Sequence, residues 1–98
     1  MEVPHSSLLF VRHPHPMLVY EIESMRLLAV NESMVRTYGY AESELLSMTL
    51  RDLHLPEDFQ DLEANIAQVS EGVDEAGIWR HVDKSGRILH AEIFSEVL

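Results

Sequence analysis

Histidine is the residue type in this sequence best suited to metal or proton chemistry, because a neutral imidazole binds metal ions and titrates near neutral pH. The chain contains six histidines. His13 and His15 lie two residues apart, and His81 and His90 fall in two segments that could face each other in a hairpin. A zinc site needs three or four converging ligands, and the sequence contains no HExxH or similar set. The histidines therefore predict no metal site, and a small metal-dependent enzyme is the weakest of three functional alternatives.

Carboxylates between Glu57 and Glu63 are a second group that could do acid–base chemistry. Glu57 and Asp61 lie one turn apart if this segment is helical, with Asp58 beside them. General acid–base catalysis needs a cleft that shifts a carboxyl pKa, whereas these acids fall on the polar side of the expected helix. The sequence has no G-x-S-x-G, no phosphate-binding glycine loop and no Cys–His pair. We interpret the acids as a solvated surface and predict no catalytic residues.

Composition limits the classes of partner. The 98 residues suit one domain, and 46% hydrophobic residues are typical of a globular protein. Seven Lys and Arg against seventeen Asp and Glu give a net charge of -10, which argues against contact with nucleic acid or anionic lipid. No apolar run approaches the ~20 residues that cross a bilayer. The lack of cysteine excludes disulfides and fits a reducing compartment, so we expect a cytoplasmic protein.

The stretch from Ala29 to Leu46 organises the elements that must position these groups. Asn31 can cap a helix over 32–38, and Gly39 can end it in the left-handed conformation that glycine adopts without steric cost. A second short helix is expected over 42–48.

Alternating apolar residues predict strands over 17–22 and 26–30, which form a hairpin before these helices. After the helices we expect a helical turn over 49–55. Pro56 suits the first turn of a longer helix, expected over 57–70 with one apolar side.

The last part of the chain predicts a second hairpin, with strands over 76–82 and 87–97 joined by Asp83-Lys84-Ser85-Gly86. A four-residue turn places Val82 opposite Arg87, and hence Arg80 opposite Leu89 and Ile78 opposite Ala91. In this register Trp79, His81, Ile88 and His90 lie together on the outer face. Phe94 adds an aromatic ring to that face, which predicts that the apolar N-terminal patch Leu8–Val11 or a second subunit covers it.

Two of these segments resemble the signatures of PAS sensory domains. Asn31, Gly39-Tyr40 and Glu42-Ser43-Glu44-Leu45 resemble the motif N-x-A followed by GY-S-x-E-E-L, with Ser33 and Ala41 as departures from it. The hairpin from Trp79 to Glu92 resembles the second signature, a strand ending in K-D-G followed by another strand. The resemblance covers about residues 14–98.

The resemblance implies an α+β fold in which helices cover one face of an antiparallel sheet with strand order 2-1-5-4-3. We expect one domain over residues 1–98, with residues 1–13 as a flexible tail and N-terminal cap and 14–98 as the core. Four strands are evident. The resemblance implies a fifth, central strand after Leu98, so we expect one of three explanations: the chain is cut short, a partner supplies the strand, or the count is wrong.

The resemblance also implies a place for a small ligand, between the helices and the inner face of the sheet. The residues expected to line it, which could equally form a closed core, are Met34, Tyr38, Leu46, Met48, Leu53, Phe59, Ile66, Leu89, Ala91 and Ile93. Relatives bind haem, flavin or small acids there. A flavin photoadduct needs a cysteine, which is missing, and His54 is only a weak candidate for a haem ligand.

The leading functional hypothesis is a non-catalytic sensory or signal-relay module of a larger bacterial signalling protein, such as a histidine kinase, a diguanylate cyclase or a transcription regulator. It implies a homodimer, an effector domain and a possible small ligand. The alternative is a ligand-free structural dimerisation module. The residues expected to face a second copy are Leu8, Leu9, Phe10, Trp79, Ile88 and Phe94.

Overall fold

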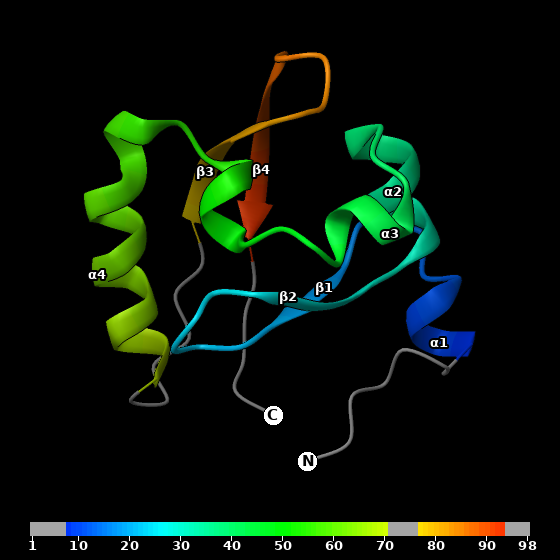
Figure 1. Cartoon of the computed structure of the whole chain (residues 1–98), viewed down its shortest axis with the longest axis horizontal. Coiled ribbons are helices and arrows are strands. Elements are labelled where there is room, and N and C mark those ends of the chain that lie inside the picture. The colour runs from blue at the N-terminus through cyan, green and yellow to red at the C-terminus, as the bar shows by residue number, and fades with distance from the viewer. Residues whose placement is uncertain (1–7, 71–76, 94–98) are drawn as a thin grey trace.

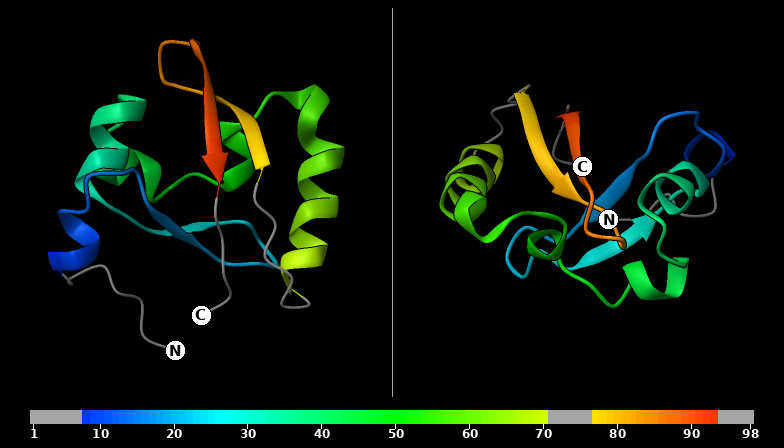
Figure 2. Two further views of the ribbon diagram at one scale, coloured as in Figure 1. Left: turned by 180° about the vertical axis from the view of Figure 1, so that it is seen from behind. Right: turned by 90° about the horizontal axis from the view of Figure 1, so that it is seen from above.

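A short helix, α1 (Leu8–Val11), begins the part of the chain that the computed structural model describes, which is residues 8–70 and 77–93 (Figure 1). Residues 1–7 of the predicted tail and cap, together with Phe94 and the end of the predicted last strand, lie outside these residues. Helix α4 lies on one side of the second hairpin, and α2 and α3 lie on the other (Figures 1 and 2). The predicted α+β class is confirmed.

The first hairpin consists of β1 (Leu18–Tyr20) and β2 (Leu27–Val30), both shorter than predicted. The strands are antiparallel, with Leu18 opposite Val30 and Tyr20 opposite Leu27. The register shifts after Val19, as in a β-bulge. Leu27, Ala29 and Val30 are buried, so β2 contributes to the core.

Helix α2 (Glu32–Tyr38) has the predicted bounds, because both of its ends are set locally. The Asn31 side-chain oxygen accepts a hydrogen bond from the Met34 amide at 3.0 Å. Gly39 ends the helix with a φ of 80° and donates its N–H to the Val35 carbonyl. The Asn31 oxygen also accepts from the Met17 amide at 2.9 Å, so one buried side chain joins the start of α2 to the start of β1.

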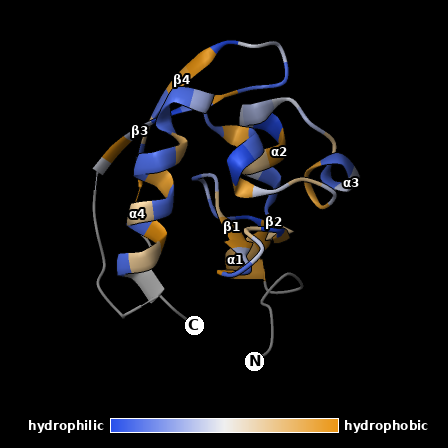
Figure 3. Ribbon diagram, turned by 60° about the vertical axis from the view of Figure 1, so that its left-hand side comes forward, coloured by the Kyte–Doolittle hydropathy of each residue, from blue (hydrophilic) through white to orange (hydrophobic). Residues whose placement is uncertain are grey.

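The middle of the chain is a series of short helices. They are α3 (Glu42–Leu45), η1 (Leu50–Leu53), η2 (Pro56–Asp58) and α4 (Phe59–Ser70). Leu62 and Ile66 are the buried side of α4, and Figure 3 shows hydrophobic residues on one side of this helix and hydrophilic residues on the other. The amphipathic pattern therefore predicted this helix correctly, except that its first turn is tightened into a 3₁₀ helix.

The second hairpin has a different register from the one predicted. It pairs β3 (Gly77–Val82) with β4 (Ile88–Ile93), with Val82 opposite Ile88 and Trp79 opposite Ala91. The prediction assumed a four-residue turn. In the structure the Asp83 amide donates to the Arg87 carbonyl at 3.0 Å, so the loop has three residues and ends with Gly86 at a φ of 89°.

This shift of one residue moves side chains to the opposite face of the hairpin. Trp79 and His81 share a face with Ala91 and Leu89, and both Trp79 and Leu89 pack against the hydrophobic core. The prediction that Trp79 lies on the outer face was therefore wrong. The outer face carries Ile78 and Ile88, which are exposed.

The two hairpins form separate two-stranded sheets in the described part of the chain. Isolated bridges link Arg26 to Thr49 and His54 to His81, so the helical segment is joined to each hairpin. The strand order 2-1-5-4-3 stays a prediction. The core between the hairpins and the helices consists of Leu27, Val30, Met34, Tyr38, Leu45, Leu50, Leu53, Leu62 and Ile66.

Candidate functional site

The residues predicted to line a ligand pocket fall in and around this core. Met34, Tyr38, Leu53 and Ile66 are buried, and the remaining six are partly buried. Seven of the ten belong to the core cluster or pack against it, and the three that do not are Phe59, Ala91 and Ile93. A well-packed core and a ligand site use the same residue types, so ligand binding here stays a prediction.

A polar cluster inside this core joins three segments that are distant in the sequence. The Tyr38 hydroxyl from α2 makes a short hydrogen bond with His81 Nδ1 on β3. The His81 ring lies edge-on to the ring of His54, with centroids 4.5 Å apart, and His54 is edge-on to Trp79. Both histidines are buried, with His81 only 3% exposed.

The environment keeps this cluster uncharged at neutral pH. Burial raises the pKa of Tyr38 to about 12, so its hydroxyl stays protonated. Burial, and then the positive charge that His54 would carry, lower the pKa of His81 to about 4. Burial also lowers the pKa of His54, whose Nδ1–H donates to the Leu50 carbonyl at 2.9 Å. Tyr38 and His81 are therefore both neutral, and the tautomer of the His81 ring sets which of the two donates in their hydrogen bond.

The sequence patterns did not predict this cluster, because the wrong register placed His81 on the outer face. Side chains alternate along β3, so His81 lies on the same face as Trp79. The large apolar side chain of Trp79 is the signal that could have identified this face as the one that packs against the core. His54, the weak haem candidate, is enclosed by the rings of His81 and Trp79. No group of three or more metal-binding side chains occurs among the described residues.

The contact residues predicted on α1 separate into two kinds. Leu8 and Leu9 are 70% and 85% exposed, whereas Phe10 is 5% exposed. Phe10 therefore packs within the described chain, and its placement on an outward surface was wrong. The four residues of α1 are all apolar and point in different directions around the helix. The first two are exposed to solvent, and the third is buried.

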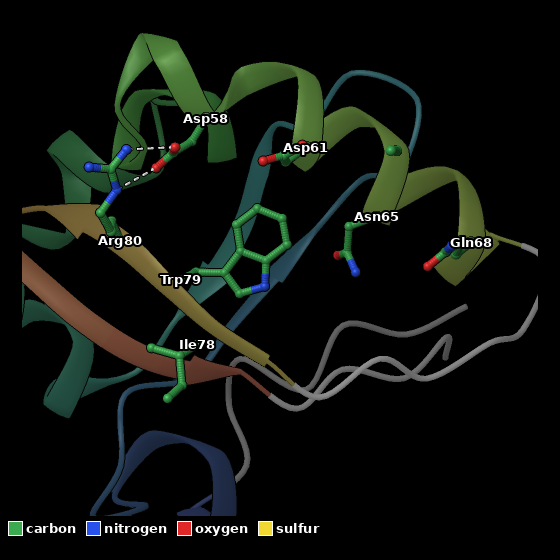
Figure 4. A pocket seen from close by; sticks show the side chains of 8 residues that line it. Asp58, Asp61, Asn65, Gln68, Ile78, Trp79 and Arg80 are labelled. Atoms are coloured by element: carbon green, nitrogen blue, oxygen red, sulfur yellow. Dashed lines mark hydrogen bonds and ion pairs between the residues drawn. The ribbon is translucent and has the colours of Figure 1, made fainter.

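Two surface grooves flank the second hairpin. The first, of about 430 Å³, runs between α4 and β3 and includes Trp79 (Figure 4). The second, of about 360 Å³, lies between the end of α2 and the β3–β4 loop. Its cationic side chains are already paired, since Lys84 contacts Glu44 at 3.0 Å and Arg87 contacts Asp83 at 3.2 Å.

The second groove also shows how the two signature segments meet. The Lys84 amide donates to the Tyr38 carbonyl at 3.0 Å, and its ammonium group reaches Glu44 at the start of α3. Glu44 also accepts from the Ala41 amide at 2.8 Å, and these hydrogen bonds lower its pKa. The β3–β4 loop is thereby fixed to the turn between α2 and α3.

None of the helices in the described part of the chain has the length and apolar content needed to cross a membrane. A search of curated protein sequences gave no match.

The fold of this chain is similar to that of several solved domains. A domain of a sensory box sensor histidine kinase/response regulator from Geobacter sulfurreducens is 20% identical, with a TM-score of 0.85 over 95% of this chain and 81% of that one. The PAS domain of an HTR-like protein from Haloarcula marismortui is 21% identical, with a TM-score of 0.76 over 89% and 71%. A PAS domain from a two-component sensor histidine kinase is 28% identical, with a TM-score of 0.63 over 78% and 65%.

The sequence itself also matches a family. The profile described as the PAS fold matches residues 15–95, which include both hairpins and all the helices after α1. PAS domains are generally non-catalytic sensory modules, and this one carries the helix–sheet core and the two signature segments in contact with each other. The chain belongs to the PAS fold family.

Proposed function

We propose that this PAS domain is a non-catalytic sensory and signal-relay module of a larger signalling protein. The observation that carries the proposal is the family match over residues 15–95, supported by the likeness to domains of sensor histidine kinases. In this role an input changes how the helices pack against the strands, and an effector domain of the same protein responds. Such an input must have different affinities for two states of the domain. A cytoplasmic location stays a prediction.

Dimerisation is the proposed route by which the change in helix packing is transmitted to the effector domain. Leu8 and Leu9 on α1 expose apolar side chains, as do Ile78 and Ile88 on the outer face of the hairpin. Burial of such side chains against a second copy would be favourable by about 25 cal/mol for each Å² removed from water. These two surfaces are the candidates for contact with a homodimeric partner.

A small ligand in the helix–sheet core is the proposed input, and a ligand-free relay is its rival. The continuous packing of Met34, Tyr38, Leu53 and Ile66 with the strands favours the ligand-free form. The buried hydrogen bond between Tyr38 and His81 gives a ligand two polar groups to compete for. The two forms differ in whether purified protein carries a bound molecule.

Native mass spectrometry of the purified chain, compared with its denatured mass, tests both points at once. Extra mass in the native spectrum supports a ligand-filled core, and a dimer without extra mass supports the ligand-free relay. A bare monomer at every concentration contradicts dimerisation, and the ligand hypothesis then rests on whether added small molecules raise the melting temperature.

Substitutions separate the two candidate surfaces. Leu9→Glu tests α1 and Ile88→Glu tests the hairpin, and each is expected to weaken a dimer that uses that surface. Gln60→Glu is the matched control, because it adds the same charge to an exposed polar position on α4. Sedimentation equilibrium measures the dissociation constants. Equal dissociation constants for all three variants and the parent chain would exclude both surfaces.

A further inference from the structure

We propose that the groove between α4 and β3 binds a small organic cation, an alkylammonium or guanidinium compound, with Trp79 as its platform and Asp61 as its counter-charge. This site lies outside the helix–sheet core and does not depend on the proposed sensory function. The groove has a volume of about 430 Å³. Its lining residues are Asp58, Asp61, Ala64, Asn65, Gln68, Ile78, Trp79 and Arg80.

The groove has an aromatic wall on one side and a polar wall on the other. The Trp79 side chain extends from β3 toward α4, and Asp61 and Asn65 lie along the facing side of the helix (Figure 4). Asp61, Asn65 and Gln68 recur at intervals of four and three residues, so they form one helical stripe. A bound molecule would therefore have the indole on one side and a carboxylate and two amides on the other.

Charge at the groove favours a cation. Asp58 is paired with Arg80 through two hydrogen bonds, of 3.0 Å to Nε and 2.7 Å to a terminal nitrogen. This pair neutralises one carboxylate and closes one end of the groove (Figure 4). Asp61 makes no ion pair within the described residues and keeps its charge for a ligand. The net charge of -10 on the whole chain adds attraction for a cation at longer range.

The indole is held in place before any ligand arrives. Trp79 packs against the hydrophobic core, and the His54 ring meets it edge-on with centroids 5.7 Å apart. A tryptophan face is the strongest aromatic partner for an ammonium or guanidinium group. The Asn65 side chain, which is half-buried, makes no hydrogen bond to another described residue and can accept from a ligand N–H. An anion would meet Asp61, and a purely apolar molecule would leave these polar groups unpaired.

The chain carries one tryptophan, so fluorescence reports on this groove directly. We would titrate 1,5-diaminopentane and agmatine into the full 98-residue chain and follow Trp79 emission. The expected result is a saturable change for both cations and none for 1-pentanol, which has the same apolar length without the charge. Saturation by 1-pentanol at the same concentrations would overturn the proposal.

Asp61→Asn is the decisive variant, because it removes the charge at an exposed position and leaves the fold intact. It should weaken the binding of both cations about tenfold or more, because the ligand loses one charge-assisted hydrogen bond to the Asp61 carboxylate. Glu42→Gln is the control, since it removes the same charge from exposed α3 and should leave binding unchanged. Equal affinities for Asp61→Asn and Glu42→Gln would refute the site. That outcome would leave the dimer and mass measurements of the sensory proposal unaffected.

Discussion

A hydrogen bond between the Tyr38 hydroxyl and His81 Nδ1 inside the core joins the end of α2 to the last turn-side residues of β3. These two residues are 43 positions apart in the sequence. A buried polar contact of this kind is favourable only while both partners are present, because either one alone is left without a hydrogen bond. The pair is therefore a sensitive point at which the helices and the second hairpin depend on each other.

Tyr38→Phe removes the hydroxyl and leaves His81 Nδ1 buried without a partner. We expect the free energy of unfolding to fall by about 1–3 kcal/mol. Urea denaturation followed by circular dichroism measures the change. Tyr40→Phe is the matched control, since Tyr40 is only half-buried and forms no side-chain hydrogen bond within the described residues. A loss no larger than that of the control would show that the Tyr38 contact contributes nothing to stability.

Acid should weaken the fold in a window set by the core histidines. The pKa of His81 is lowered from 6.5 to about 4 by burial, so between these pH values the unfolded chain binds a proton that the folded chain does not. Stability is complete above pH 6.5 and falls as the pH drops through this window, by on the order of 3 kcal/mol from His81. The lowered pKa of His54 acts in the same direction.

Urea denaturation between pH 7 and pH 4 measures this dependence. His81→Gln removes one titrating group and should flatten the slope, even if it lowers stability at neutral pH. His90→Gln replaces an exposed histidine of the same hairpin and is the matched control. An unchanged slope in His81→Gln would contradict the assignment.

Ala41→Ser should stabilise the protein. Ala41 is the N-cap of α3, with extended φ and ψ of -68° and 155°. Its methyl group cannot accept a hydrogen bond from the first turn of the helix. Its amide already donates to Glu44, so half of a capping box is in place. A serine hydroxyl would supply the other half and add about 1 kcal/mol to the free energy of unfolding.

The control for the cap adds the same hydroxyl elsewhere. Ala67→Ser places it within α4, where serine has a lower helix propensity than alanine and should reduce stability slightly. Thermal denaturation of both variants gives the comparison. If Ala41→Ser loses stability as Ala67→Ser does, the capping interpretation of α3 is incorrect.

Gly86→Ala tests the three-residue loop that sets the hairpin register. Gly86 has a φ of 89°, and a Cβ there would meet no atom within 4 Å, so the cost is backbone strain alone. We expect a loss of about 1–2 kcal/mol. Gly77→Ala on β3, where φ lies outside the left-handed region, should cost less. Equal costs at the two positions would argue against the left-handed conformation at Gly86 and against this register.

The sequence alone determined the elements whose ends depend on neighbouring residues. Asn31 and Gly39 set the bounds of α2, because each acts on backbone groups within four residues. The apolar side of the segment after Pro56 predicted α4, because residues three and four positions apart share one face of a helix. The two signature segments also identified the family, because each is a short run of neighbouring residues that can be recognised without knowing what it contacts.

Only the tertiary structure decided how these elements meet. Whether Asp83 pairs with Arg87 sets the length of the loop and the register of the hairpin, and the face that carries His81 packs inward. The Lys84 contact with Glu44 spans 40 positions, and the Tyr38 contact with His81 spans 43. Local sequence patterns do not predict such contacts, because the energy of each contact depends on how the whole chain packs around it.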